Sequence, residues 1–144
     1  MNLQIANAPS FNIEAISIIV SALLVWLAAL VQNFSNALRH GSGYVMSDRS
    51  RSVPTDGFFG RATRTLSNNM ESVLMYVPPM IIVITNGLHN NVTAMTAATY
   101  IGARSVFVLS YWLNIPGVRS VAWFVGMTCC AIIATVAAVG LISP

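Results

Sequence analysis

The chain has 144 residues, of which 56% are hydrophobic and only 8% are charged. Soluble domains usually carry about 25% charged residues, so this composition cannot cover a surface that faces water. The charged residues are seven arginines and four acids, with no lysine, and the arginines form no basic face on a soluble fold. We therefore expect no nucleic-acid partner, and we expect one domain that lies mostly in membrane lipids.

Four apolar stretches are long enough to span the ~30 Å hydrocarbon core of a bilayer as helices. The expected membrane helices cover residues 13–31, 66–85, 92–113 and 118–142. Residues 32–65 form one long polar loop, whereas the other two connections are short and predict antiparallel neighbours. Pro78 and Pro79 should kink the second helix, because each removes a backbone donor. The sequence thus predicts an all-α membrane protein, a bundle of four transmembrane helices.

The distribution of arginine predicts how this bundle is oriented. The long loop and the last connection must lie on the same side of a protein that crosses the membrane four times. Arg39, Arg49, Arg51, Arg61 and Arg64 lie on or beside the long loop, and Arg119 follows the last connection. The opposite side, which includes both termini, has neither Arg nor Lys. By the positive-inside rule, residues 32–65 face the cytoplasm and both termini lie outside.

Polar residues within the expected spans indicate a binding site. Four of them open the second helix at spacings of 3, 4 and 3, which places them on one helical stripe. They are Arg61, Arg64, Asn68 and Glu71. On the third helix Arg104 and Tyr111 share a face, and Arg104 lies at a depth where we expect an ion pair with Glu71. Such a pair could simply lock two helices together, but one acid leaves several arginines unneutralised, which favours an anionic ligand.

The same residues carry a family resemblance. The run RATRTLSNNME resembles the R-x-x-R-A-x-x-N-x-x-E signature of the MAPEG family, the membrane-associated proteins in eicosanoid and glutathione metabolism. The run RSVFVLSY from Arg104 to Tyr111 resembles the family's arginine and the tyrosine seven residues later. PGVRS resembles the Pro-x-Arg-Ser element of the fourth helix, with one extra residue. The details are similar to a bacterial branch, and Thr65 and Phe107 depart from the family pattern in a way that argues against prostaglandin synthase activity.

The resemblance implies a left-handed four-helix bundle that assembles as a homotrimer. For a protein of the bacterial inner membrane, the arginine distribution then predicts that both termini are periplasmic. The resemblance also implies glutathione as a co-substrate near the cytoplasmic face and a lipophilic small molecule that enters from the membrane. It assigns glutathione binding to Arg61, Arg64, Asn68, Glu71, Arg104 and Arg119. It assigns catalysis to Tyr111 and Arg104, since guanidinium and phenol donors favour the thiolate form of a thiol.

Several functions are compatible with these residues. We expect a glutathione-dependent transferase or peroxidase, and the alternative is a non-catalytic member that binds a lipid or serves a larger membrane complex. A small proton-coupled transporter needs an acid near mid-bilayer, whereas Glu14 is expected at the outer edge of its span, where water solvates it. His40 and His89 stand alone in expected loops, and Cys129 and Cys130 are adjacent, so we expect no metal site.

Overall fold

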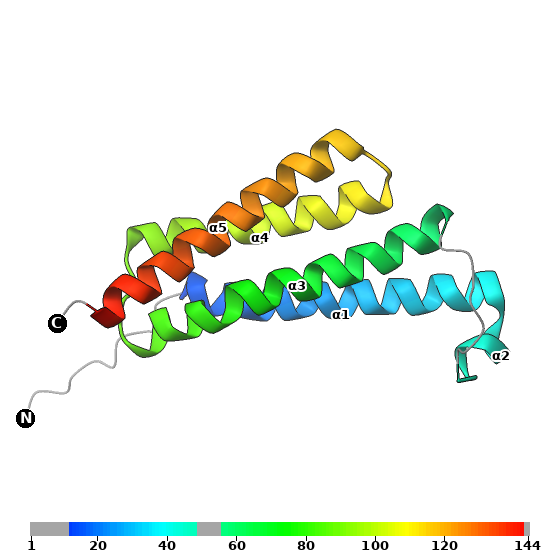
Figure 1. Ribbon diagram of the computed structural model, residues 1–144, viewed down its shortest axis with the longest axis horizontal. Helices are drawn as coiled ribbons and strands as arrows, with labels where there is room; N and C mark the ends of the chain where they lie inside the picture. The colour runs from blue at the N-terminus through cyan, green and yellow to red at the C-terminus, as the bar shows by residue number, and fades with distance from the viewer. Residues whose placement is uncertain (1–11, 49–55, 143–144) are drawn as a thin grey trace, which may run out of the picture.

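The computed structural model describes residues 12–48 and 56–142. These residues form five helices and no strand. They are α1 (Ile13–His40), α2 (Ser42–Val45), α3 (Gly57–Thr85), α4 (Asn91–Trp112) and α5 (Pro116–Ile142). The four long helices alternate in direction (Figure 1). One end of the bundle, here called the terminal end, contains the start of α1, the end of α5 and the α3–α4 connection. The opposite end, here called the α2 end, contains α2 and the α4–α5 connection.

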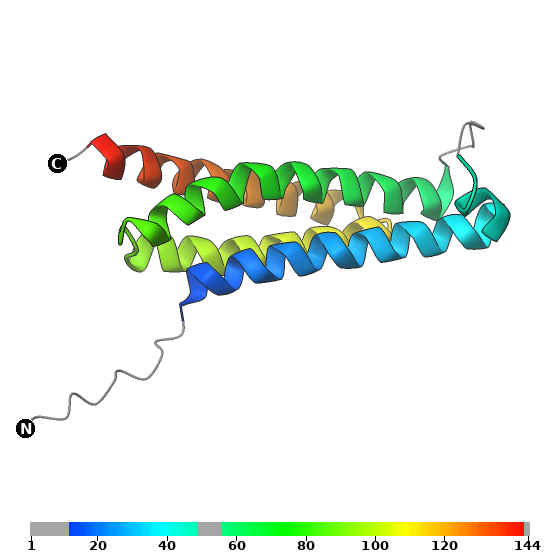
Figure 2. The same ribbon diagram turned by 90° about the horizontal axis from the view of Figure 1, so that it is seen from below.

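The four long helices pack as a ring. α1 contacts α3 and α4, α5 contacts the same two helices, and α3 also touches α4 across the middle. Figure 2 shows the result as two layers, α3 with α5 and α1 with α4. The largest buried cluster fills the half of the bundle near the terminal end. It comprises Tyr76, Met80, Val83, Ala97, Tyr100, Cys129, Cys130, Ile133 and Ala137.

Three helices are long and apolar enough to cross a bilayer, namely α1, α4 and α5. Large apolar side chains point outward from the bundle, including Trp26 on α1 and Phe124 on α5, which are 61% and 67% exposed. Such surfaces are stable only against hydrocarbon, so the chain is a multi-pass membrane protein. α3 has 29 residues but is less apolar over its length, because its first half contains the polar run from Arg61 to Glu71.

Two helices extend further toward the α2 end than the apolar pattern predicted. α1 continues to His40 and α3 begins at Gly57, so the expected loop at residues 32–65 is wrong in length and the actual connection contains the short helix α2. An apolar stretch marks only the part of a helix that hydrocarbon surrounds, and a helix continues beyond it until a residue ends it. Gly41 ends α1 with φ of 82°, a conformation that glycine adopts without strain. Arg49 and Arg51 lie outside the described residues.

An ion pair joins the two helices at the α2 end. Arg39 Nη2 lies 2.5 Å from Asp56 Oδ1, and Arg39 Nη1 donates to the Asp56 backbone oxygen at 2.6 Å. The hydrogen bond from Arg39 holds the pKa of the Asp56 carboxyl below its ordinary value of 3.8, and the charge of Arg39 acts in the same direction. The pair ties the last turn of α1 to the residue that precedes α3.

α3 continues as a helix through Pro78 and Pro79 to Thr85. The helix loses two backbone donors there without ending, and Tyr76 and Met80 on either side of the prolines are fully buried in the core cluster. Tertiary packing therefore holds a helix that local propensity alone would break. Pro116 is the first residue of α5, where a backbone N–H would have no acceptor within the helix, so a proline is tolerated there.

Glu14 occupies a different environment from the one predicted. Its side chain is only 5% exposed, and its Oε1 accepts a hydrogen bond from Thr93 Oγ1 at 2.7 Å. Thr93 belongs to the capping box that begins α4, where its hydroxyl also accepts from the Asn90 backbone N–H. Glu14 does lie in the first turn of α1, as expected, but the start of α4 covers it and excludes water.

Candidate functional site

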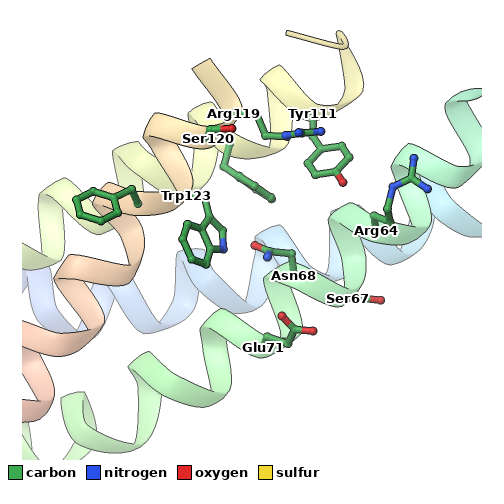
Figure 3. A pocket seen from close by; sticks show the side chains of 10 residues that line it. Arg64, Ser67, Asn68, Glu71, Tyr111, Arg119, Ser120 and Trp123 are labelled. Atoms are coloured by element: carbon green, nitrogen blue, oxygen red, sulfur yellow. The ribbon is translucent and has the colours of Figure 1, made fainter. Parts of the chain in front are cut away.

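A pocket of about 660 Å³ lies between α3, α4 and α5 in the half of the bundle near the α2 end (Figure 3). Its walls are Arg64, Ser67, Asn68 and Glu71 of α3, Phe107 and Tyr111 of α4, and Arg119, Ser120, Trp123 and Phe124 of α5. Five of the seven residues that the sequence singled out are among them. They are Arg64, Asn68, Glu71, Tyr111 and Arg119.

The α3 wall follows directly from helical spacing. Arg64, Asn68 and Glu71 are separated by four and three residues, so their side chains leave one side of the helix at successive turns. Arg64 and Glu71 are exposed, and Asn68 is partly buried. Figure 3 shows this row facing the residues that α4 and α5 contribute.

The opposite wall depends on the tight hairpin between α4 and α5. Asn114 adopts φ of 60° in this turn, a conformation that asparagine tolerates better than most residues. The hairpin brings the Arg119 guanidinium carbon to 4.6 Å from the centre of the Tyr111 ring. Phe107 packs edge-on against the same ring at 5.3 Å. Tyr111 is therefore held between an aromatic ring and a cation, and Figure 3 shows its hydroxyl pointing toward α3.

Arg104 does not line the pocket. It is only 2% exposed, and its Nη2 donates to Asn68 Oδ1 at 2.9 Å and to Asn69 Oδ1 at 2.5 Å. The expected ion pair with Glu71 is wrong: both residues are described, and no nitrogen of Arg104 lies within 4 Å of the Glu71 carboxylate. Glu71 is on the exposed side of α3, whereas Asn69 points into the bundle and reaches Arg104 first.

Arg61 also lies outside the pocket walls. Its guanidinium carbon is 5.7 Å from the centre of the Phe58 ring, and its Nε is buried without a hydrogen-bond partner. Arg61 lies on the same stripe as Arg64 but one turn nearer the α2 end, and the pocket extends along α3 only as far as Arg64.

The model of the MAPEG family matches residues 13–139, from the first residue of α1 almost to the end of α5. The chain belongs to the MAPEG family. Comparison with curated proteins and with solved structures gave no match. In this MAPEG chain the run RATRTLSNNME lies on α3, and the arginine and tyrosine seven residues apart lie on α4.

Five wall residues of the MAPEG pocket were not among the predicted site residues. They are Ser67, Phe107, Ser120, Trp123 and Phe124. Helical spacing could have found three of them. Phe107 precedes Tyr111 by four residues, and Trp123 follows Arg119 by four, so each shares a face with a predicted site residue. Ser67 lies three residues after Arg64 and four before Glu71, so it shares the predicted stripe of α3.

The MAPEG pocket combines charge with aromatic surface. Its walls carry two guanidinium groups, one carboxylate, one amide and one phenol, beside three aromatic side chains without charge. Guanidinium groups bind carboxylates through paired, charge-assisted hydrogen bonds. In the described part of the chain no three His, Cys, Asp or Glu side chains gather closely enough to hold a metal ion. The arrangement suits a small anionic molecule that also carries a cationic group.

Proposed function

We propose that this MAPEG protein binds glutathione in the pocket between α3, α4 and α5 and uses its thiol to conjugate or reduce lipophilic electrophiles. The supporting observation is the set of charges on the walls, Arg64 and Arg119 against Glu71. Glutathione carries two carboxylates and one ammonium group, so each charged group of the tripeptide has a counterpart. The pocket volume, about 660 Å³, is in the usual range for small-molecule sites.

Each wall residue has a role in this proposal. Arg64 and Arg119 hold the two carboxylates, and Glu71 holds the ammonium group. The Tyr111 hydroxyl donates a hydrogen bond to the glutathione sulfur, which favours the thiolate. The thiolate then gives its electron pair to an electrophilic carbon and forms a thioether, and the leaving group of that carbon, such as the halide of an aryl halide, departs with the electron pair of its broken bond. The thiol proton passes to water. Aromatic side chains, including Trp123 and Phe124, line the pocket on the side from which a lipophilic electrophile would approach.

The membrane arrangement is part of the proposal. α3 is as long as the three apolar helices and packs along α1 and α5, so we propose that it crosses the bilayer with them. Its exposed Arg64 and Glu71 would then face hydrocarbon in a single copy, which is unfavourable for charged groups. A second copy would cover them, which supports an oligomer, and the family resemblance favours a homotrimer. We place the chain in the bacterial inner membrane with the α2 end in the cytoplasm and both termini in the periplasm.

Cysteine labelling tests the orientation. Ser47→Cys near α2 and His89→Cys in the α3–α4 connection are both exposed positions at opposite ends of the bundle. A thiol reagent that cannot cross the membrane should label Cys at 89 in intact cells and should label Cys at 47 only after lysis. The buried Cys129 and Cys130 provide the background, measured on the unmodified chain. The reverse pattern would overturn the orientation.

Thermal unfolding in detergent tests glutathione binding. A ligand that binds only the folded state stabilises it by RT ln(1 + [L]/Kd), about 2.7 kcal/mol at about 100 times Kd. Millimolar glutathione should raise the melting temperature of the wild type. Arg64→Ala should abolish this rise, whereas Arg39→Ala, which removes an arginine at the same end of the bundle but outside the pocket, should keep it. An unchanged melting temperature for the wild type would refute glutathione as the ligand.

Tyr111→Phe separates binding from catalysis. The variant keeps the ring that packs against Phe107 and Arg119, so it should keep the stabilisation by glutathione. Without the phenolic hydroxyl it should conjugate an activated aryl halide at least tenfold more slowly, because one catalytic donor is lost. Equal rates for the variant and the wild type would remove Tyr111 from the mechanism.

The second candidate is a non-catalytic protein that binds lipid or acts as an accessory subunit of a larger membrane complex. An apolar groove of about 800 Å³ favours it. The groove lies between α1 and α3 at the α2 end and is lined mainly by Leu30, Val31, Phe34, Leu38, Phe58 and Phe59, with Arg39 beside them. An acyl chain could lie in this groove. Binding of glutathione without turnover of any electrophile or peroxide would favour this candidate.

A further inference from the structure

Arg104 is the largest fully buried side chain in the described part of the chain. It lies behind the wall of the pocket. Its guanidinium carbon stands 4.4 Å from the centre of the Phe107 ring, and Phe107 itself lines the pocket. Its Nη2 donates to two neighbouring side chains of α3, Asn68 and Asn69, of which only Asn68 also reaches the pocket. Arg104 thus touches the site through other residues.

We propose that Arg104 is a positioning residue that fixes the Asn68 amide with its NH₂ group toward the pocket, where it donates to a carboxylate or carbonyl oxygen of the ligand. This inference rests on the proposed function and refines it. It replaces the predicted direct contact between Arg104 and glutathione. It also assigns Asn68 a defined chemical preference, for a hydrogen-bond acceptor.

The orientation follows from donor chemistry. A guanidinium group has five N–H donors and no acceptor, so only the oxygen of an asparagine amide can face it. Asn68 Oδ1 accepts from Arg104 at 2.9 Å, which leaves the two N–H donors of Nδ2 for other partners. Asn68 is partly exposed and forms part of the pocket wall. A free asparagine could rotate its amide by 180° and offer either end, but this one cannot without losing the bond.

Three helices hold the guanidinium in place. On α3, Asn69 accepts from the same nitrogen at 2.5 Å, and on α4 the Phe107 ring covers one face of the group. On α5, Gly126 leaves the space that the arginine side chain occupies, because a Cβ at this position would lie 3.2 Å from Arg104 Cδ. Arg104 Nη1 is buried and has no hydrogen-bond partner, so no acceptor at that nitrogen draws the group away from Asn68 and Asn69.

Asn69 provides a matched control for Asn68. The two are consecutive residues of one type and accept from one nitrogen, but Asn69 is 2% exposed and does not line the pocket. Aspartate in either position keeps the oxygen that faces Arg104 and adds a negative charge beside a buried cation. Both variants should therefore fold, with melting temperatures above that of the wild type. Only Asn68→Asp replaces a donor by an anionic oxygen in the pocket.

The experiment measures glutathione affinity by titration calorimetry and melting temperature without ligand, both in detergent. Asn68→Asp should bind glutathione at least about tenfold more weakly than the wild type, because a donor to a carboxylate is replaced by a like charge. Asn69→Asp should stay within about twofold of the wild type. Arg104→Lys, which keeps the charge but not the planar fork, should lose affinity less than Arg104→Met does.

The outcomes separate this inference from the proposed function. Equal losses in Asn68→Asp and Asn69→Asp, or no loss in either, would refute the assignment of Asn68 as a donor. Absence of glutathione binding by the wild type would refute the proposed function, and the melting temperatures would then test the positioning role. Asn68→Asp should raise the melting temperature in the wild-type background and fail to do so in Arg104→Met. The same shift in both backgrounds would overturn the inference.

Discussion

The partners of Arg104 can be identified by measuring which substitutions are energetically coupled to Arg104→Met. The sequence suggested that Glu71 is the partner, whereas Arg104 in fact donates to Asn69 at 2.5 Å and Glu71 is exposed on α3. Two double-mutant cycles, Arg104→Met with Asn69→Leu and Arg104→Met with Glu71→Gln, distinguish the two assignments. In each cycle the coupling energy is the departure of the double variant from the sum of the single variants.

The expected magnitudes follow from burial and distance. A hydrogen bond to a charged donor is worth about 1.5–3 kcal/mol, but polar contacts between membrane helices usually measure lower because the unfolded chain also finds partners. We expect a coupling of about 1–2 kcal/mol between Arg104 and Asn69. Between Arg104 and Glu71 we expect less than about 0.5 kcal/mol, since an exposed acid beyond contact distance is largely screened.

The free energy of unfolding can be measured by titrating a mild detergent with dodecyl sulfate while following helix content. Arg104→Met alone should be destabilising, because it leaves the oxygens of two asparagines without their donor. A coupling to Glu71 that equals or exceeds the coupling to Asn69 would refute the reasoning. It would mean that the ion pair forms in the membrane after all.

Three further predictions concern other parts of the bundle. Gly102→Ala should raise the free energy of unfolding by up to about 1 kcal/mol, because the added Cβ meets nothing within 4 Å and alanine favours a helix. At Gly126 an added Cβ would lie 3.2 Å from the Arg104 side chain, so Gly126→Ala should be less stable than Gly102→Ala by about 1 kcal/mol. Equal effects of the two substitutions would contradict this close contact. Thr93→Val should lower the free energy of unfolding by about 1–3 kcal/mol, because it removes the hydrogen-bond donor to the buried Glu14. No change in a denaturant titration would show that water reaches this carboxylate. The pKa of Asp56 is depressed in the folded state, so its contribution to stability is present above the ordinary value of 3.8 and is lost as the pH falls through the depressed value. The difference in melting temperature between the wild type and Asp56→Asn should therefore shrink below about pH 4. A constant difference down to about pH 3 would contradict the ion pair.

The sequence by itself determined the class of protein and most of the pocket wall on α3. Composition and the length of apolar stretches require a lipid environment, and helical spacing alone places Arg64, Asn68 and Glu71 on one side of a helix. The family resemblance was confirmed by the match over residues 13–139. These properties depend on local periodicity and on short motifs, which a chain displays before it folds.

The tertiary structure decided which of the polar residues meet. Depth along a helix can be counted from the sequence, but the rotation of one helix against another cannot. Glu71 and Asn69 point to nearly opposite sides of α3, and the rotation of α3 in the packed bundle turns Asn69 toward Arg104. The same holds for Glu14, which the start of α4 covers although it lies at the end of its own helix. The pairing of Arg119 with Tyr111 likewise depends on the hairpin between α4 and α5. Contacts between helices are set by packing over the whole interface, so a stripe on a single helix does not reveal them.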